Sequence, residues 1–358
     1  MMSRVDRLRS MPLEPWLEAG RPLAEAVVLR LRARGVRSDD LLPAICELAT
    51  DGDAQCRDFL KDIETPPEWA DFDRMRPGAA MACRHFPMLG VALLHGGLMT
   101  TFCSADAAYI LAGTNRLEQD VVRRIFESGT LFFGVLDIDA LRPGGSAWET
   151  CVRVRLMHTM IRMNLGSARE WPLRGVPINA LQTSAGPLFF GSMVLDRLRS
   201  SGAVISPAEA DGYYLIWRYV TAVLGVPRDL LGDTAEEQAA LDARVLEYSF
   251  DPDDNSRKLA DALLSGLKHL PHAERVPRAV HEVLARHMLG DMRADAMGID
   301  RHRLGSWLAR VVARGLTAYG WFQRIPVVAP RLERFGRGYL ERLVREGLAG
   351  VPADFQPQ

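Results

Sequence analysis

Apolar residues recur at helical spacing along most of the chain. In segments 23–31 and 306–316 they fall three and four positions apart, which places them on one face of an α-helix. Only residues 131–136, Leu-Phe-Phe-Gly-Val-Leu, form a short continuous apolar run that would also suit a buried strand. We therefore predict an all-α protein.

Turn-forming residues divide the predicted helices into layers. Dense groups of Pro, Gly and Asp occur at residues 65–67, 142–145 and 251–254. They predict an N-terminal helical layer (1–65), a main domain (66–350) whose last part (236–350) is a C-terminal helical layer, and a polar tail (351–358). The chain has no internal repeat. We expect the layers to pack as one domain.

One helix is predicted together with both of its ends. Ser146 and Glu149 have the spacing of a capping box, in which each side chain bonds to the backbone amide of the other residue. Gly166 is of the residue type that ends helices in the left-handed conformation. Between them, residues 146–165 are apolar on opposite faces, so we expect this helix to be buried.

The same helix carries an imidazole between two guanidinium groups. Arg155 and Arg162 lie one turn to either side of His158, and Glu149 is the only acid within the helix. Buried guanidinium groups keep their charge and need anionic partners. A haem would supply an iron atom for the histidine and two propionates for the arginines. The commoner alternative is a core histidine bonded to a carbonyl, with both arginines paired to acids of other helices.

Charge and composition narrow the class of protein. The net charge of −1 gives no basic field for nucleic acid. Residues 301–348 nevertheless hold ten arginines against three glutamates, with Trp307 and Trp321 interleaved. This stretch would suit an anionic membrane surface. A solvated face that pairs with acids elsewhere is the commoner outcome for such a charge run, and we expect that outcome here.

Cysteine usage and the N-terminus bear on the compartment. The five cysteines form no Cys-x-x-Cys pair, which argues against a disulfide framework or a structural zinc site. The motif Cys-x-x-Cys-His is also absent, so any haem would be held without covalent attachment. The first residues lack the apolar core of a secretory signal, and we expect a cytoplasmic protein.

The segment around His158 resembles a known family. Residues 152–162, Val-Arg-Val-Arg-Leu-Met-His-Thr-Met-Ile-Arg, are similar to the axial-histidine helix of the latex-clearing, or rubber oxygenase, family, also called mpaB-like or DUF2236. Further segments match in the same order at residues 65–71, 116–128, 175–179, 213–226 and 289–298. The resemblance implies a globin-like helical core around a non-covalent haem b, with His158 as the iron ligand and Arg155 and Arg162 beside the propionates.

The resemblance also assigns catalytic residues, with departures from the family pattern. Arg124 matches a family arginine and is expected to contact the cofactor and orient dioxygen. Glu127 and Ser128 stand where the secreted rubber-cleaving members carry a distal lysine and a threonine. We expect Glu127 to pair with an arginine of its own helix. The acid that serves as a base in the family falls on Ala108, with Asp106 as the nearest carboxylate.

The resemblance predicts a haem b-dependent oxygenase or oxidase that brings dioxygen to a small apolar substrate, alkene or isoprenoid-like, inside the cell. The departures argue against polyisoprene itself. A haem-binding sensor or carrier without turnover and a helical interaction protein without cofactor remain as alternatives. His281 and His287 lie six residues apart, which does not match the zinc motif His-Glu-x-x-His, and no nucleotide-binding glycine motif occurs.

Overall fold

The computed structural model confirms the all-α prediction. It describes residues 3–36, 40–113, 121–167, 171, 175–270, 275–302, 305–323, 325–351 and 353, and no strand occurs among them. The helices are α1 (Arg4–Ser10), α2 (Pro22–Ala33), α3 (Leu41–Thr50), α4 (Ala54–Glu64), α5 (Phe72–Arg84), α6 (Phe86–Val91), α7 (Met99–Phe102), α8 (Ala105–Gly113), α10 (Val121–Gly134), α11 (Ser146–Ser167), α12 (Ala180–Gly186), α13 (Met193–Ser200), α14 (Pro207–Val223), α15 (Ala235–Tyr248), α16 (Asp254–Gly266), α17 (Arg278–Leu289), α18 (Asp291–Ala296), α19 (Gly305–Phe322) and α20 (Ala329–Gly347).

Shorter elements interrupt these helices. Two segments, η3 (Ala92–Leu98) and η4 (Pro187–Ser192), are wound as π-helices and contact each other. Single 3₁₀ turns lie at η1 (Glu14–Trp16), η5 (Arg228–Leu230) and η6 (Leu267–His269). The apolar run at 131–136 continues α10 as far as Gly134 and is not a strand. The start of the 116–128 segment and most of the tail 351–358 lie outside the described residues.

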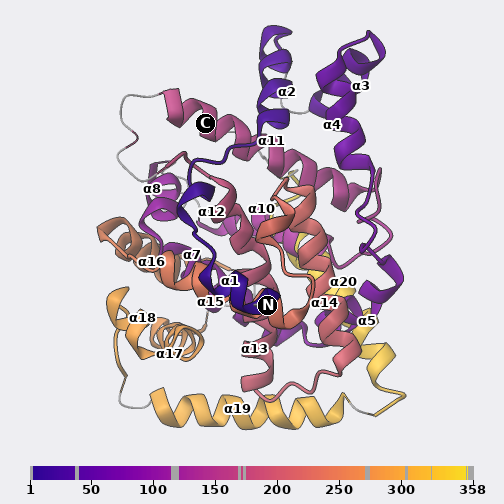
Figure 1. Ribbon diagram of the computed structural model, residues 1–358. Coiled ribbons are helices and arrows are strands. Elements are labelled where there is room, and N and C mark those ends of the chain that lie inside the picture. The colour runs from indigo at the N-terminus through magenta and orange to yellow at the C-terminus, as the bar shows by residue number, and fades with distance from the viewer. Residues whose placement is uncertain are drawn as a thin grey trace.

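The N-terminal segment covers one end of the fold. Figure 1 shows α2, α3 and α4 together at the top of the molecule, with α19 along the bottom edge. Helix α2 contacts both α4 and α11, whereas α1 lies apart from these helices and contacts α15. This arrangement brings α2, from the predicted N-terminal layer, against the helix that carries His158.

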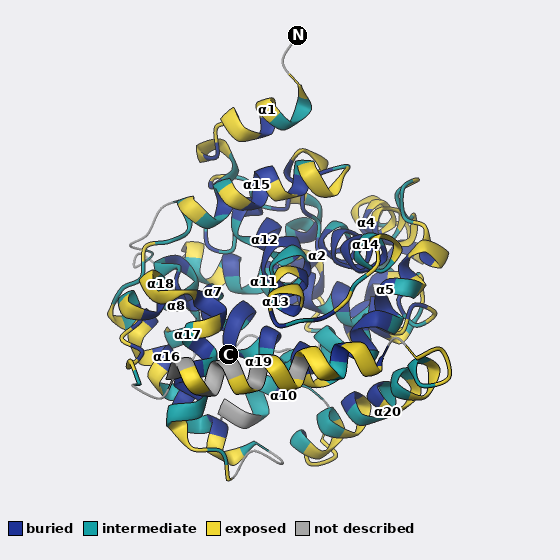
Figure 2. Cartoon of the chain, turned by 90° about the horizontal axis from the view of Figure 1, so that it is seen from below, coloured by how far each residue is buried: buried dark blue, intermediate teal, exposed yellow. Residues whose placement is uncertain are grey.

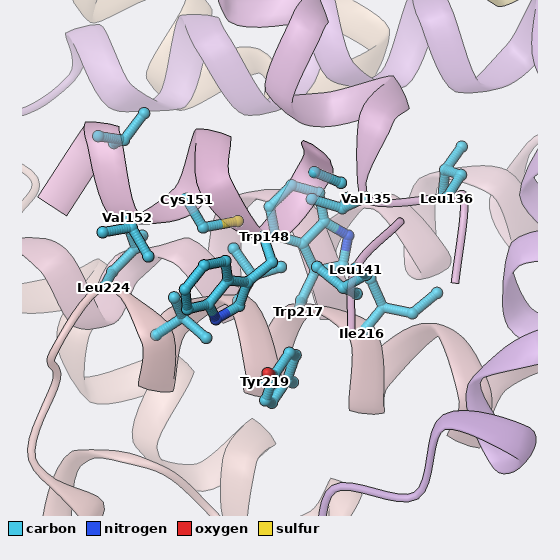
Figure 3. Packing of buried hydrophobic residues seen from close by; sticks show 14 of the residues in the cluster. Val135, Leu136, Leu141, Trp148, Cys151, Val152, Ile216, Trp217, Tyr219 and Leu224 are labelled. Atoms are coloured by element: carbon cyan, nitrogen blue, oxygen red, sulfur yellow. The ribbon is translucent and has the colours of Figure 1, made fainter. Parts of the chain in front are cut away.

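Helix α11 is held in the largest hydrophobic cluster. Figure 3 shows Trp148 and Cys151 of α11 beside Trp217 and Tyr219 of α14 in this cluster. The Trp148 indole donates a 3.0 Å hydrogen bond to the carbonyl of Ile63, which joins α11 to the end of α4. Arg155 and Arg162 are buried in this packing, so each of them needs a partner within the protein or in a bound group.

Helices α5 and α14 cross at unusually short range. A Cβ atom built on Gly78 of α5 would lie 2.0 Å from the backbone nitrogen of Tyr213, and one on Gly212 of α14 would lie 2.5 Å from the carbonyl oxygen of Arg74. Only glycine permits backbones to approach so closely at this crossing. The crossing fixes α14, which in turn supports α11.

The helices do not include a simple membrane span. Among the described residues, no single helix combines the length and the apolar composition required to cross a bilayer. The stretches Phe86–Phe102 and Ala105–Gly113 meet these requirements only when taken together, and they are bent by 99° relative to each other.

Candidate functional site

The helix with His158 begins close to where its sequence predicted. Helix α11 starts at Ser146, but the amide of Glu149 donates to the carbonyl of Gly145 at 2.9 Å, so the predicted capping box is wrong. Gly145 comes one residue before Ser146, and its carbonyl accepts the first helical hydrogen bond. Gly166 lies within the helix, which continues to Ser167.

His158 is a neutral histidine deep in the protein. Burial, together with the positive charges of Arg21, Arg162 and Arg124, lowers its pKa to about 3. Its Nδ1 atom is buried and has no hydrogen-bond partner among the described residues. The residue as a whole is partly buried and keeps some accessible surface. A neutral imidazole in such a place is suited to bind a metal ion.

Arg155 and Arg162 of α11 each have an acidic partner from the N-terminal segment. Arg155 donates to Asp62 at 2.8 Å and to the carbonyl of Val223 at 3.2 Å. Arg162 donates to Glu25 at 2.9 Å. Both arginines thus pair with acids of other helices, as in the commoner alternative that the sequence left open. The predicted contact of Arg155 and Arg162 with haem propionates stays a prediction.

The segment 175–179 forms a strained turn beside Arg162. Ile178 has a positive φ of 48°, which is rare for a β-branched residue, and its carbonyl accepts a 3.1 Å hydrogen bond from Arg162. Asn179 then caps α12 in a capping box with Gln182. The Gln182 amide donates to buried Asp106 at 3.0 Å. The turn thus links α11 to the carboxylate of α8.

Arg21 is the residue that sequence reasoning missed. It precedes α2 and is 4% exposed, and its three side-chain nitrogens have no hydrogen-bond partner among the described residues. Burial lowers its pKa well below the usual range, and the charges of Arg162 and Arg155 lower it further. Glu25 accepts from the backbone amide of Arg21 and from Arg162, not from the Arg21 guanidinium. The charge of Glu25 raises the pKa of Arg21, but Glu25 makes no hydrogen bond to the guanidinium. A buried guanidinium without a hydrogen-bond partner among the described residues is costly and indicates a place for an anion.

The three predicted catalytic residues of α10, Arg124, Glu127 and Ser128, lie in different surroundings. Glu127 is 3% exposed and accepts from Arg123 at 3.1 Å and from Arg124 at 3.4 Å, which confirms the expected pairing within its own helix. Arg124 lies close enough to His158 to lower its pKa. Ser128 instead lines an apolar cavity, and His158 is not among the residues that line it. Arg124 is therefore the residue of the three whose charge reaches His158, whereas Ser128 faces the apolar cavity.

The apolar cavity has a volume of about 290 Å³. Its walls come from η3, α10 and α20, and include Phe132, Ser128 and Leu343. Two buried histidines, His95 and His281, also line it, with 3.1 Å between Nε2 of His95 and Nδ1 of His281. The size and the apolar walls suit a small apolar molecule.

The described residues contain no cluster of three or more metal-ligating side chains. Glu282 accepts from Arg278 and contacts His302, and its neighbour His281 contacts His95. The neutral His158 and the Arg21 guanidinium, which has no hydrogen-bond partner among the described residues, fit an anionic haem, because haem needs one axial imidazole and positive partners for its propionates.

The buried histidines predict a pH-dependent stability for the haem-free protein. Burial lowers the pKa of His158 and His95 to about 3 and that of His85 to about 4. The unfolded chain therefore takes up protons that the folded chain does not, so the free energy of unfolding should fall as the pH drops from about 6.5 to 4, by roughly 1 kcal/mol per histidine and pH unit. Urea titrations across this range measure it. His85→Phe should make the dependence shallower, and an unchanged slope would contradict the assignment.

Comparison with known proteins connects this arrangement to a family. Residues 83–348 match the family described as ER-bound oxygenase mpaB/B'/Rubber oxygenase, catalytic domain. The rubber oxygenase of Streptomyces sp. (strain K30) is 24% identical over 354 residues, which cover 94% of this chain and 78% of that protein. The solved structure of latex clearing protein LCP in the closed state has a TM-score of 0.70 at 20% identity, over 92% of this chain and 90% of that chain. This likeness shows the same all-helical fold, and the extent of the family match shows that the chain belongs to the oxygenase family of mpaB, B' and rubber oxygenase.

Proposed function

We propose that this protein is a haem b-dependent oxygenase or oxidase that acts with dioxygen on a small apolar substrate inside the cell. The observation that carries the proposal is the neutral His158, whose Nδ1 has no hydrogen-bond partner among the described residues and which lies close enough to Arg21 for that charge to lower its pKa. Membership of an oxygenase family supports the class of reaction.

The haem would be held by one iron ligand and by arginines that pair with its propionates. His158 is the iron ligand, since it is neutral and needs no proton loss before it binds. Arg21 is the main partner of a propionate, because Arg155 and Arg162 are already paired with Asp62 and Glu25. Haem iron supplies the activation of dioxygen when it is bound. Arg124, paired with Glu127, would donate to the oxygen species, and Ser128 would contact the substrate in the apolar cavity.

An apolar alkene with isoprenoid-like units is the proposed substrate class. The cavity of about 290 Å³ between η3, α10 and α20 has mainly apolar walls and adjoins the helix of Arg124. It holds a short chain better than a polymer. The name rubber oxygenase of the Streptomyces relative points to the same kind of carbon skeleton.

A visible spectrum of the freshly purified protein tests the proposal. We expect a haem Soret band, release of the haem by acid and acetone, and oxygen consumption with short isoprenoid alkenes that exceeds consumption with polyisoprene. Haem without substrate-dependent oxygen consumption would favour a sensor or carrier. A protein that stays colourless after haem supplementation would be an interaction protein without cofactor, and the proposal would be wrong.

Arg124→Leu should slow turnover more than it lowers haem content. The Arg124 guanidinium can donate to a partly negative oxygen species, and Glu127 holds it in place at 3.4 Å. Because Arg124 is partly exposed, we expect a decrease in kcat of about tenfold, the effect of one charge-assisted hydrogen bond. Arg123→Leu is the matched control, since Arg123 also pairs with Glu127. Equal kcat values for both variants would exclude a special role for Arg124.

A further inference from the structure

The outward face of α19 is apolar. Trp307, Val311, Trp321 and Phe322 are 58%, 45%, 62% and 52% exposed. At about 100° per residue, these four positions fall within an arc of roughly 100° on the helix. Figure 2 shows exposed residues along α19, which crosses the lower face of the molecule in front of the buried interior. Solvated helices normally place polar residues on such a face.

The opposite side of α19 is attached to the protein. The Tyr319 hydroxyl donates to the carbonyl of Arg84 at 2.8 Å, and the side chain of Gln323 is buried and donates to the same carbonyl at 3.3 Å. A Cβ atom on Gly320 would lie 2.6 Å from the carbonyl oxygen of Gly202. The exposure of the outward face is therefore not the result of a detached helix.

The apolar surface continues into the turn after α19. Ile325 and Val327 are 46% and 62% exposed, and Phe335 at the start of α20 is 57% exposed. Most of the large apolar side chains that the structure describes as exposed lie between residues 307 and 335. Such a concentration on one face marks an interaction surface rather than the scattered apolar residues of an ordinary protein surface.

The positive charge of α19 and the turn that follows it favours a negatively charged partner. Residues 301–332 contain six arginines and no aspartate or glutamate, and Arg301 among them is paired with Asp295. Arg314 is exposed and lies on the same arc as Trp307 and Val311. Two copies of the chain that met through this face would bring like charges together, which disfavours a dimer. Arginine beside tryptophan and aliphatic residues matches an anionic bilayer surface, where the apolar side chains enter the headgroup region and arginine pairs with phosphate.

We propose that α19 and the turn that follows it dock this protein on an anionic lipid bilayer, with the helix axis parallel to the membrane plane. The sequence alone favoured a solvated face that pairs with acids elsewhere, and the outward position of both tryptophans changes that interpretation. The inference goes beyond the proposed function and does not depend on haem.

Sedimentation with lipid vesicles tests the inference on the full-length protein. We expect binding to vesicles of phosphatidylcholine with roughly one-third phosphatidylserine, weak binding to pure phosphatidylcholine, and weaker binding at high salt. Val311→Asp should lower the partition coefficient about tenfold or more, because a carboxylate then faces the headgroups. Leu29→Asp is the matched control, since Leu29 is 52% exposed on α2 at the other end of the molecule. Both sites are exposed, so both variants should unfold at the same temperature as the parent.

Arg314→Gln separates charge from apolar contact. It should lower binding to the anionic vesicles about fivefold, which is the effect of one arginine near the surface, and leave binding to phosphatidylcholine unchanged. Equal binding to both kinds of vesicle, or equal partition of the parent and Val311→Asp, would overturn the inference. Self-association that Val311→Asp abolishes, without vesicle binding by the parent, would also overturn it and assign the face to contacts between copies.

Discussion

His158→Ala is expected to abolish stable haem binding, with a loss of affinity of at least about three orders of magnitude. The alanine removes the iron ligand, and no other histidine lies on α11 to replace it. Haem content per protein after gel filtration, together with titration of the apoprotein with haem, measures the loss. Adding imidazole to His158→Gly should restore a coloured complex, because a free imidazole can enter the space that the side chain leaves.

His85→Ala is the control for burial. His85 is 1% exposed, its Nδ1 also lacks a partner among the described residues, and burial lowers its pKa to about 4. It therefore shares the electrostatic character of His158 but lies between α5 and α6, and His85→Ala should keep its haem. A normal Soret band in His158→Ala would exclude this residue as the ligand even though the chain belongs to the oxygenase family.

Arg21→Leu should have opposite effects on the haem-free and haem-loaded forms. Without haem, Arg21 is a buried cation with no hydrogen-bond partner for its guanidinium among the described residues, and leucine at this position should raise the free energy of unfolding by about 2 kcal/mol. With haem, the same change removes a propionate partner. Breaking a buried charge pair costs about 3–5 kcal/mol, or roughly two to four orders of magnitude in haem affinity. Urea unfolding of the apoprotein measures the gain in the free energy of unfolding, and haem titration measures the loss of haem affinity.

Arg218→Leu shows what a purely structural buried arginine does. Arg218 is 2% exposed, is paired with Asp233, and lies 3.9 Å over the ring of Trp69. Its loss should destabilise the haem-free and haem-loaded forms alike and leave haem affinity unchanged. If Arg21→Leu behaves in the same way, Arg21 is a structural residue, and the propionates must be held by Arg155 and Arg162.

The parts of the site that depend on local spacing were predictable from the sequence. Helix α11, its histidine and the pairing of Glu127 with Arg123 and Arg124 follow from intervals of a few residues, where helix geometry alone sets the contacts. The start of α11 was right although its capping box was not, because the backbone of Gly145 took the role given to Ser146.

The parts that depend on tertiary contacts were not predictable. Glu25 lies 137 positions before Arg162, and Asp62 lies 93 positions before Arg155. Nothing in periodicity or composition shows which of many acids a buried arginine will meet. Arg21 gave no signal either, since an arginine before a helix that starts with proline is ordinarily exposed. The outward face of α19 was equally hidden, because an apolar stripe normally predicts the side of a helix that is buried.

The contacts of α2 and α4 with α11 have a consequence for how this protein can be divided. The family match begins at residue 83, within α5, yet Arg21, Glu25 and Asp62 all lie before that point. A fragment cut at the edge of the match would leave Arg155 and Arg162 buried without their acids and could not be moved to another scaffold as an independent module. The N-terminal segment is therefore an integral part of the catalytic domain. Exchanging this segment between relatives would require exchanging Arg155 and Arg162 as well.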